Sequence, residues 1–335
     1  MLRLIPNARF SIGVHIGVGM FRVAVTDLIA EIIYNQMTKF DLDTPSEDVI
    51  SKVAENIELI IQESGVDRAN VIGIGVGASG LVNYMSGVNV LAPRLGWKDV
   101  PIQYLLESHL DLPVSVDNNV RSMALGEAFF GAYRGVGSLA FVYGRIGVGA
   151  GFVVDGQLFR GSSAGAGEIG HTIMLPQGGD LCSCGNSGCL ETLISEPVLV
   201  KQAELFAEEN PESLLSQYLK KEDISGKMEQ IFTAARDGDK ISLDFIEDRA
   251  CYLGIALGNL INMINPEVIL LGGMFAQGHD LIIPVAEEKM KEVAFARLGE
   301  KVQIAATGFG WRAGVIGAAA LALTTFFYQH AEGIK

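Results

Sequence analysis

The chain has 335 residues, of which 49% are hydrophobic and 19% charged. This length predicts one large or two ordinary domains, and the composition excludes a disordered chain. The net charge of −14 argues against nucleic-acid binding by this chain alone, because such binding depends on phosphate neutralisation by Lys and Arg. No apolar run reaches membrane-spanning length, and the start MLRLIPNARF lacks a signal-peptide core. We therefore expect a cytoplasmic protein that does not interact with a membrane.

Glycine punctuation, β-branched segments and apolar residues at helical spacing predict the elements of the first half. In chain order these are two strands joined by a glycine turn at 10–28, a third strand at 31–41, a helix at 46–64, a buried strand at 70–83, an irregular loop at 87–97, a helix at 100–110, a strand at 112–120 and a helix at 121–133. Ser46 is expected to cap the first helix.

The second half continues the alternation of strands and helices. Its predicted elements are a hairpin at 137–161 with its turn at Asp155-Gly156, a helical segment at 197–248 with loops at 208–213 and 220–227, an apolar helix at 248–263 that ends at Asn265-Pro266, a strand at 268–273, a loop at 274–279, a helix at 281–294, a strand at 302–307 and a helix at 313–327. This order indicates an α/β chain with two sheets.

Three polar residues, Asp117, Asn118 and Asn119, end the predicted strand at 112–120. Open α/β sheets bind ligands at such strand ends, so these residues are site candidates. Asn and Asp are also good helix caps, and capping of the following helix explains the same residues equally well.

A cysteine cluster lies between Gly165 and Glu191. Cys182, Cys184 and Cys189 fall within eight residues, and His171 precedes them. The cluster could be accidental or redox-active, but in a cysteine-poor chain without secretion signals this spacing favours a structural zinc site. The remaining cysteine, Cys251, is expected to be a small buried apolar residue.

Several motifs give the chain a resemblance to the ROK family of repressors and sugar kinases. These motifs are GEIGH followed by CSCGNSGCLE, with APRLGW, DNNVRSMALGE, NPEVILLGG and AGVIGAAALA in the family's order. The resemblance implies an α/β, actin-like ATPase (ribonuclease H-like) fold. Its two lobes would have an interlobe sugar cleft and a zinc-stapled loop. It also implies a small lobe at 1–118 completed by 312–330, a large lobe at 119–311, and a homodimer.

The resemblance also implies site residues. The family's sugar contacts map to Asn118, Asn119, Glu168, His171 and Glu191. Its zinc ligands map to His171, Cys182, Cys184 and Cys189. Amides and carboxylates supply the donors and acceptors that sugar hydroxyls need. The zinc would hold the loop that carries the two glutamates, without acting as a catalyst.

The phosphoryl-transfer residues of the family kinases are altered. Asn119 occupies the position of the general base, which an amide cannot replace, and Asp117 is a poor substitute for it. The first phosphate turn has His15, Gly17, Val18 and Gly19 where the kinases have Asp, two glycines and Thr, so the carboxylate and the hydroxyl are both lost. The second has Ile146 in place of Thr, within the turn 145–149. Phosphoryl transfer depends on positioning and charge neutralisation, so three such losses should be severe.

Three functions remain open on these grounds. The preferred one is a sugar-binding protein of the transcriptional-regulator type, which senses a hexose or N-acetylhexosamine without phosphorylating it. In that branch a winged helix-turn-helix precedes the two lobes, and we expect it to be absent here, through truncation or because the chain is a stand-alone sensor. The alternative is a glucokinase-like enzyme that uses Mg-ATP, supported by Gly272-Gly273 at the family's adenosine-side turn. A purely structural dimer partner is the weakest.

Overall fold

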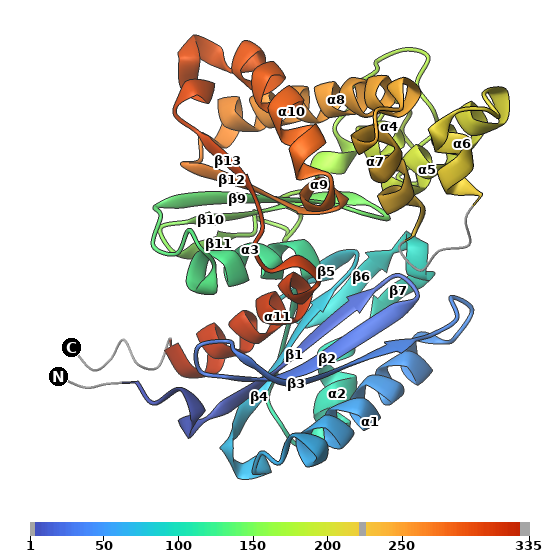
Figure 1. Ribbon diagram of the computed structural model, residues 1–335. Coiled ribbons are helices and arrows are strands. Elements are labelled where there is room, and N and C mark those ends of the chain that lie inside the picture. Colours follow the sequence, from blue (N-terminus) through green and yellow to red (C-terminus); the bar gives the residue numbers. More distant parts are fainter. Residues whose placement is uncertain (1–3, 221–225, 329–335) are drawn as a thin grey trace. The chain divides into compact units, whose positions relative to one another are not determined.

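The computed structural model describes residues 4–220 and 226–328 (Figure 1). Tertiary contacts divide the chain into two compact units. The first unit comprises Met1–Gly137, Gly151–Gly167 and Trp311–Lys335. The second comprises Ser138–Ala150 and Glu168–Gly310. Both units mix helices and strands, as the α/β prediction requires, and the first is assembled from segments far apart in the sequence.

A five-stranded sheet with the order β3-β2-β1-β4-β8 forms the centre of the first unit. Its strands are β1 (Phe10–Gly17), β2 (Met20–Asp27), β3 (Ile32–Lys39), β4 (Val71–Ala78) and β8 (Val114–Asn118). The first three are antiparallel neighbours, whereas β4 and β8 run parallel to β1. All five strands confirm the predictions, including the turn between β1 and β2, where Gly19 has a left-handed φ of 72°.

Helices cover both faces of this sheet (Figure 1). One face packs on α1 (Ser46–Ser64) and α2 (Ile102–Leu110), and the other on α11 (Ala313–Leu323), which also packs on α3 (Asn119–Phe130). Every residue of α11 is buried. Its backbone lies so close to the sheet that a Cβ atom on Gly75 would be 1.8 Å from the carbonyl oxygen of Ala318. Glycine therefore makes this close helix–sheet contact sterically feasible.

The segment Gly310–Tyr328, which contains α11, is the one described helix long and apolar enough to cross a membrane. However, 61% of it is buried inside the protein, against β1 and β4. Such a helix is typical of a protein core, so its apolar composition is explained by packing.

The second five-stranded sheet has the order β11-β10-β9-β12-β13. Its strands are β9 (Ser138–Gly144), β10 (Val148–Val154), β11 (Gln157–Phe159), β12 (Val268–Gly273) and β13 (Gln303–Ala306). Strand β12 is parallel to both β9 and β13. The predicted hairpin turn between β10 and β11 is confirmed, because Asp155 and Gly156 both have left-handed φ values of 51° and 73°.

The described helices of the second unit are α4 (Glu191–Ile194), α5 (Glu196–Glu209), α6 (Leu214–Leu219), α7 (Lys227–Arg236), α8 (Lys240–Ile264), α9 (Met274–Gln277) and α10 (His279–Val293). The predicted loop at 208–213 lies between α5 and α6, whereas most of the one at 220–227 falls outside the described residues. Helix α8 starts earlier than expected and ends as predicted at Asn265, which has a left-handed φ of 49°.

Three local predictions were wrong. The expected loop at 87–97 contains β6 (Val88–Ala92), a 3-10 turn (Pro93–Leu95) and the start of β7 (Trp97–Val100). These strands form a third sheet, β5-β6-β7, with β5 (Leu81–Asn83), so the expectation of two sheets was also too low. The expected loop after β12 contains the short helix α9. Ser46 is the first helical residue of α1 and not its cap, because Pro45 holds the cap position without a side-chain hydrogen bond.

Candidate functional site

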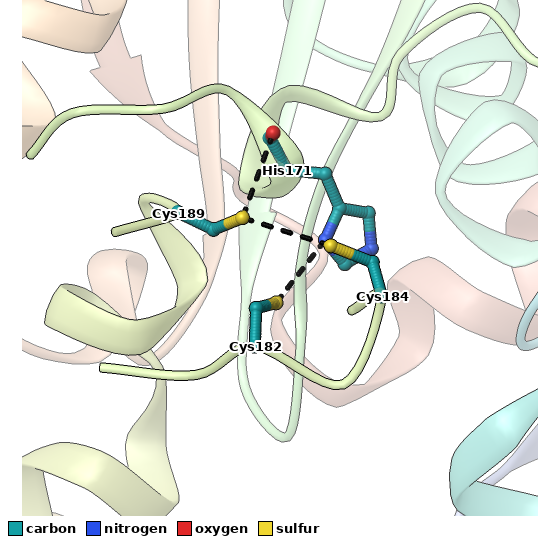
Figure 2. Close-up of side chains that lie close together, drawn as sticks. All are labelled: His171, Cys182, Cys184 and Cys189. Carbon is teal, nitrogen blue, oxygen red and sulfur yellow. Dashed lines mark hydrogen bonds between the residues drawn. The ribbon is translucent and has the colours of Figure 1, made fainter. Parts of the chain in front are cut away.

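The cysteine cluster and its histidine come together in the second unit (Figure 2). One ligand atom from each of His171, Cys182, Cys184 and Cys189 lies within 4.8 Å of the others. Cys182 Sγ is 3.5 Å from His171 Nδ1, and Cys184 Sγ is 3.7 Å from Cys189 Sγ. The predicted ligand set is therefore a compact group of four side chains.

The loop that carries these side chains is held by its backbone. The N–H of Cys182 donates to the carbonyl of Asn186 at 2.7 Å, and single β-bridges join Ile173 to Cys189 and Leu181 to Ser187. Gly188 has a φ of 74°, and a Cβ atom there would lie 1.9 Å from the carbonyl oxygen of Leu175. Only glycine fits this conformation and this contact, so the tight turn before Cys189 depends on it.

Two separations within the cluster match those around a tetrahedral zinc ion. Zinc bonds of ordinary length require about 3.8 Å between two sulfurs and about 3.6 Å between a sulfur and a nitrogen. The observed 3.7 Å and 3.5 Å agree with these separations. Three thiolates and one imidazole also form a closed donor set that leaves no position for water. The cluster could therefore hold a structural zinc ion.

The local environment distinguishes two of the thiols. Burial raises the pKa of the Cys189 thiol to about 12, so without a metal this thiol keeps its proton at neutral pH. A hydrogen bond from the backbone of Asn186 lowers the pKa of Cys184, which is exposed. Because only thiolates bind zinc, metal binding must displace the proton of Cys189.

Glu191 lies two residues after the last cysteine and begins α4. Its side chain is only 7% exposed, and its Oε2 accepts a hydrogen bond from the backbone N–H of Val148 at 3.1 Å. Leu190, between Cys189 and Glu191, donates its backbone N–H to the carbonyl of Thr172 at 2.9 Å. The backbone of the cysteine loop therefore helps to fix the position of Glu191. Glu168 is exposed, and its carbonyl accepts the backbone N–H of His171 at 3.1 Å.

The turn 145–149, which the resemblance aligned with the second phosphate turn, has contacts within the second unit. The N–H of Arg145 donates to the carbonyl of Gly147 at 2.9 Å, and the carbonyl of Arg145 accepts from the N–H of Glu196 at 2.8 Å. A Cβ atom on Gly147 would be 2.8 Å from Oε2 of Glu191. The carboxylate of Glu191 thus lies against the turn and uses the N–H of Val148.

The two asparagines lie in the first unit, at the junction of β8 and α3. Asn118 caps α3, since its Oδ1 accepts from the N–H groups of Val120 and Arg121 and its Nδ2 donates to the carbonyl of Gly80 at 2.9 Å. Asn119 is 9% exposed, and its Nδ2 donates to Ser79 Oγ at 3.2 Å. The capping role considered for Asn118 is therefore present, and Asn119 is held in one orientation.

Asp117 is fully buried between two arginines of the same unit. Nε of Arg121 is 2.7 Å from Oδ1 of Asp117, and Nε of Arg160 is 2.7 Å from Oδ2. Sequence reasoning identified neither arginine. The four-residue spacing of Asp117 and Arg121 was the only signal, and Arg160 is 43 residues away from Asp117.

Comparison with known proteins gives a coherent result. The model of the ROK family matches residues 11–325. The glucokinase of Halalkalibacterium halodurans is 32% identical, over 92% of this chain and 93% of its own length. The xylose repressor of Caldicellulosiruptor bescii is 29% identical, over 93% of this chain and 78% of its own.

Solved structures of both kinds are also similar. A ROK-family transcriptional regulator, a homologue of the E. coli MLC protein, has a TM-score of 0.85 and 29% identity, covering 95% of this chain and 78% of its own. A ROK-family glucokinase from Streptomyces griseus, solved with glucose and AMPPNP, has a TM-score of 0.82 and 28% identity. That match covers 94% of this chain and 99% of the glucokinase. Repressors and kinases are thus both among the similar proteins.

Proposed function

The chain belongs to the ROK family, and on this premise we propose that it is a sugar-binding protein of the regulator type. It would sense a hexose or N-acetylhexosamine without phosphorylating it. The observation that carries the proposal is the turn 145–149, in which Ile146 replaces the Thr that the resemblance to the kinases would put beside a phosphate. Glu191, one of the proposed sugar contacts, accepts the N–H of Val148 in the same turn.

The lack of a general base supports the same proposal. Asn119 cannot accept the proton of a sugar hydroxyl. Asp117 is no substitute, because each of its carboxylate oxygens is engaged by a guanidinium group and none of the side chain reaches solvent. A chain that binds sugar but has neither the general base nor the Thr of the phosphate turn would act as a sensor.

We propose that the sugar contacts are Asn118 and Asn119 from the first unit and Glu168, His171 and Glu191 from the second. The side chain of Asn118 already caps α3. A sugar hydroxyl would therefore bind to the remaining lone pairs of Asn118 or to its backbone. His171 can serve both sites, because the nitrogen near Cys182 is Nδ1 and a sugar hydroxyl would be bound by Nε2.

Zinc is the cofactor of this proposal, held by His171, Cys182, Cys184 and Cys189. A bound zinc ion supplies structure only, since the donor set is closed. The residues of the loop fix the peptide before Glu191 and keep the Glu191 carboxylate against Val148. We further propose a cytoplasmic homodimer, which light scattering after size exclusion would detect as twice the mass of the chain.

The second candidate is a glucokinase-like enzyme that uses Mg-ATP. The observation in its favour is Gly273, at the end of β12, which has a left-handed φ of 66° and whose added Cβ would lie 2.1 Å from the carbonyl oxygen of Gly144. Such a turn suits a nucleotide, but a tight strand-to-helix connection into α9 requires the same glycine.

One experiment separates the two functions. ADP release is measured with saturating Mg-ATP across a panel of hexoses, pentoses and N-acetylhexosamines, and the same sugars are tested by thermal shift. We expect one sugar to raise the melting temperature, because a ligand that binds only the native state stabilises it. We expect no sugar-dependent ADP. Turnover that is lost on mutation of Asn119 would overturn the proposal in favour of the kinase.

A further inference from the structure

A buried ion triad of Asp117, Arg121 and Arg160 lies inside the first unit, and none of its members is among the proposed sugar contacts. Asp117 is 0% exposed and Arg121 1%, whereas Arg160 keeps 24% of its side chain accessible. Each carboxylate oxygen of Asp117 contacts one guanidinium group at 2.7 Å. Oδ1 also accepts the backbone N–H of Asn118 at 2.7 Å. One carboxylate therefore binds two cations, where a simple buried pair would need only one.

The triad joins three segments of the first unit. Through Arg121 it reaches the carbonyl of Ala164 at 2.5 Å and the carbonyl of Val82, in β5, at 3.1 Å. Through Arg160 it reaches Tyr84, because the guanidinium carbon lies 4.3 Å above the centre of the tyrosine ring. The junction of β8 and α3, the strand β5 and the loop after β11 are thereby fixed to a single carboxylate.

The loop after β11 is the segment that most needs this support. Ala164 has a left-handed φ of 56°, which a residue with a side chain rarely adopts, yet its side chain is buried. Within the loop, the N–H of Ala166 donates to the carbonyl of Arg160 at 3.2 Å. The loop leads directly into Glu168. At the other end of the triad, Asp117 is adjacent to Asn118 and Asn119. The triad thus holds the segment that carries Asn118 and Asn119 and the loop that precedes Glu168 in the sequence.

We propose that Arg160, together with Arg121 and Asp117, is a positioning residue for sugar binding. The inference rests on the proposed function, since the positioned residues are its sugar contacts. A fully satisfied buried polar network holds one arrangement of its segments, because any other arrangement leaves a charge unpaired in a low-dielectric interior. Arg160 does not need to touch the sugar. It fixes the loop before Glu168 to the same carboxylate that adjoins Asn118.

Arg160→Gln is the variant that tests this role. Replacing Asp117 would leave two buried cations unpaired and endanger the fold, whereas Arg160 is partly exposed and its loss leaves the Asp117–Arg121 pair intact. Arg68→Gln is the matched control, because Arg68 pairs with Glu58 at 2.7 Å on the surface of the same unit. Arg160→Lys keeps the charge but loses the planar stacking on Tyr84, so it should rescue the function in part.

Two readouts are taken on the full chain. Hydrogen–deuterium exchange of residues 161–167 should be at least about tenfold faster in Arg160→Gln and unchanged in Arg68→Gln. The dissociation constant, measured by calorimetry with the sugar that stabilises the wild type most, should rise about tenfold or more in Arg160→Gln only.

Each outcome is decisive. Faster loop exchange together with weaker sugar binding supports the inference. Unchanged exchange, or faster exchange with unchanged affinity, overturns it while the proposed function stands. If no sugar binds the wild type, the proposed function itself fails and the inference falls with it.

Discussion

The carboxylate of Glu191 accepts the backbone N–H of Val148 at 3.1 Å, across 43 residues of sequence. This contact links a glutamate two residues after the last cysteine to the turn that connects β9 and β10. The folding of the cysteine loop therefore also determines whether the backbone N–H of Val148 is available to another acceptor. Both residues lie in the second unit.

Replacement of Glu191 should separate this structural contact from sugar recognition. Glu191→Ala leaves the buried N–H of Val148 without its acceptor and should destabilise the protein by about 1–3 kcal/mol, whereas Glu191→Gln retains an acceptor and should cost less. Both variants should weaken sugar binding. Urea unfolding and calorimetry measure the two effects. Equal stability of the alanine variant and the wild type would mean that the hydrogen bond contributes little.

Loss of one cysteine should abolish metal binding. We expect about one zinc ion per chain by elemental analysis in the wild type and almost none in Cys182→Ser, since three ligands do not close a tetrahedral site. Cys182→Ser should also melt several degrees lower, because structural zinc contributes to folding. Cys251→Ser is the control, as Cys251 lies in α8 outside the cluster. A full zinc content in Cys182→Ser would contradict the assignment.

The contact between α11 and the sheet should tolerate no side chain at Gly75. Gly75→Ala places a Cβ atom 1.8 Å from the carbonyl oxygen of Ala318, so helix and strand must separate, with an expected loss of about 3 kcal/mol or more. Gly308→Ala is the matched control, because an added Cβ meets no atom within 4 Å there. Chemical denaturation of the two variants should differ strongly. A small effect at Gly75 would show that α11 can shift without loss of packing.

The ion pair between Arg236 and Asp280 predicts a small pH dependence. Arg236 donates from Nε to Oδ2 at 2.9 Å and from Nη2 to Oδ1 at 2.8 Å, and these hydrogen bonds lower the pKa of Asp280. A lowered folded-state pKa contributes stability above the unfolded value of about 3.9, which is lost as the pH falls through the folded value.

Asp280→Asn should therefore be less stable than the wild type at pH 7, and the difference should vanish in acid. The side chain of Asp280 is 44% exposed, so solvent screening limits the loss to about 0.5 kcal/mol. Denaturation series at pH 7 and pH 3, with and without 1 M salt, measure it, and salt should reduce the difference. A difference that persists in acid would point to packing instead of charge.

The sequence predicted those features that are local in the chain. Five strands of the first sheet, the Asp155-Gly156 turn and the ligand set around Cys182 depend on neighbouring residues, so periodicity and spacing identify them. The strands β6 and β7 were missed because they are short and because Pro93 and Gly96 between them indicate a loop. Of the two partners of Asp117, Arg121 was indicated only by its four-residue spacing, and Arg160 could not be predicted because it is 43 residues away in the sequence.

The path of the first unit has a consequence for biosynthesis. Its sheet is complete once β8 has been made, but α11, the main helix on one side of β1 and β4, follows only after the whole second unit. Domains generally fold in the order of their synthesis. Here the second unit can close before the first, and the uncovered side of β1 and β4 stays exposed to chaperones until α11 has left the ribosome.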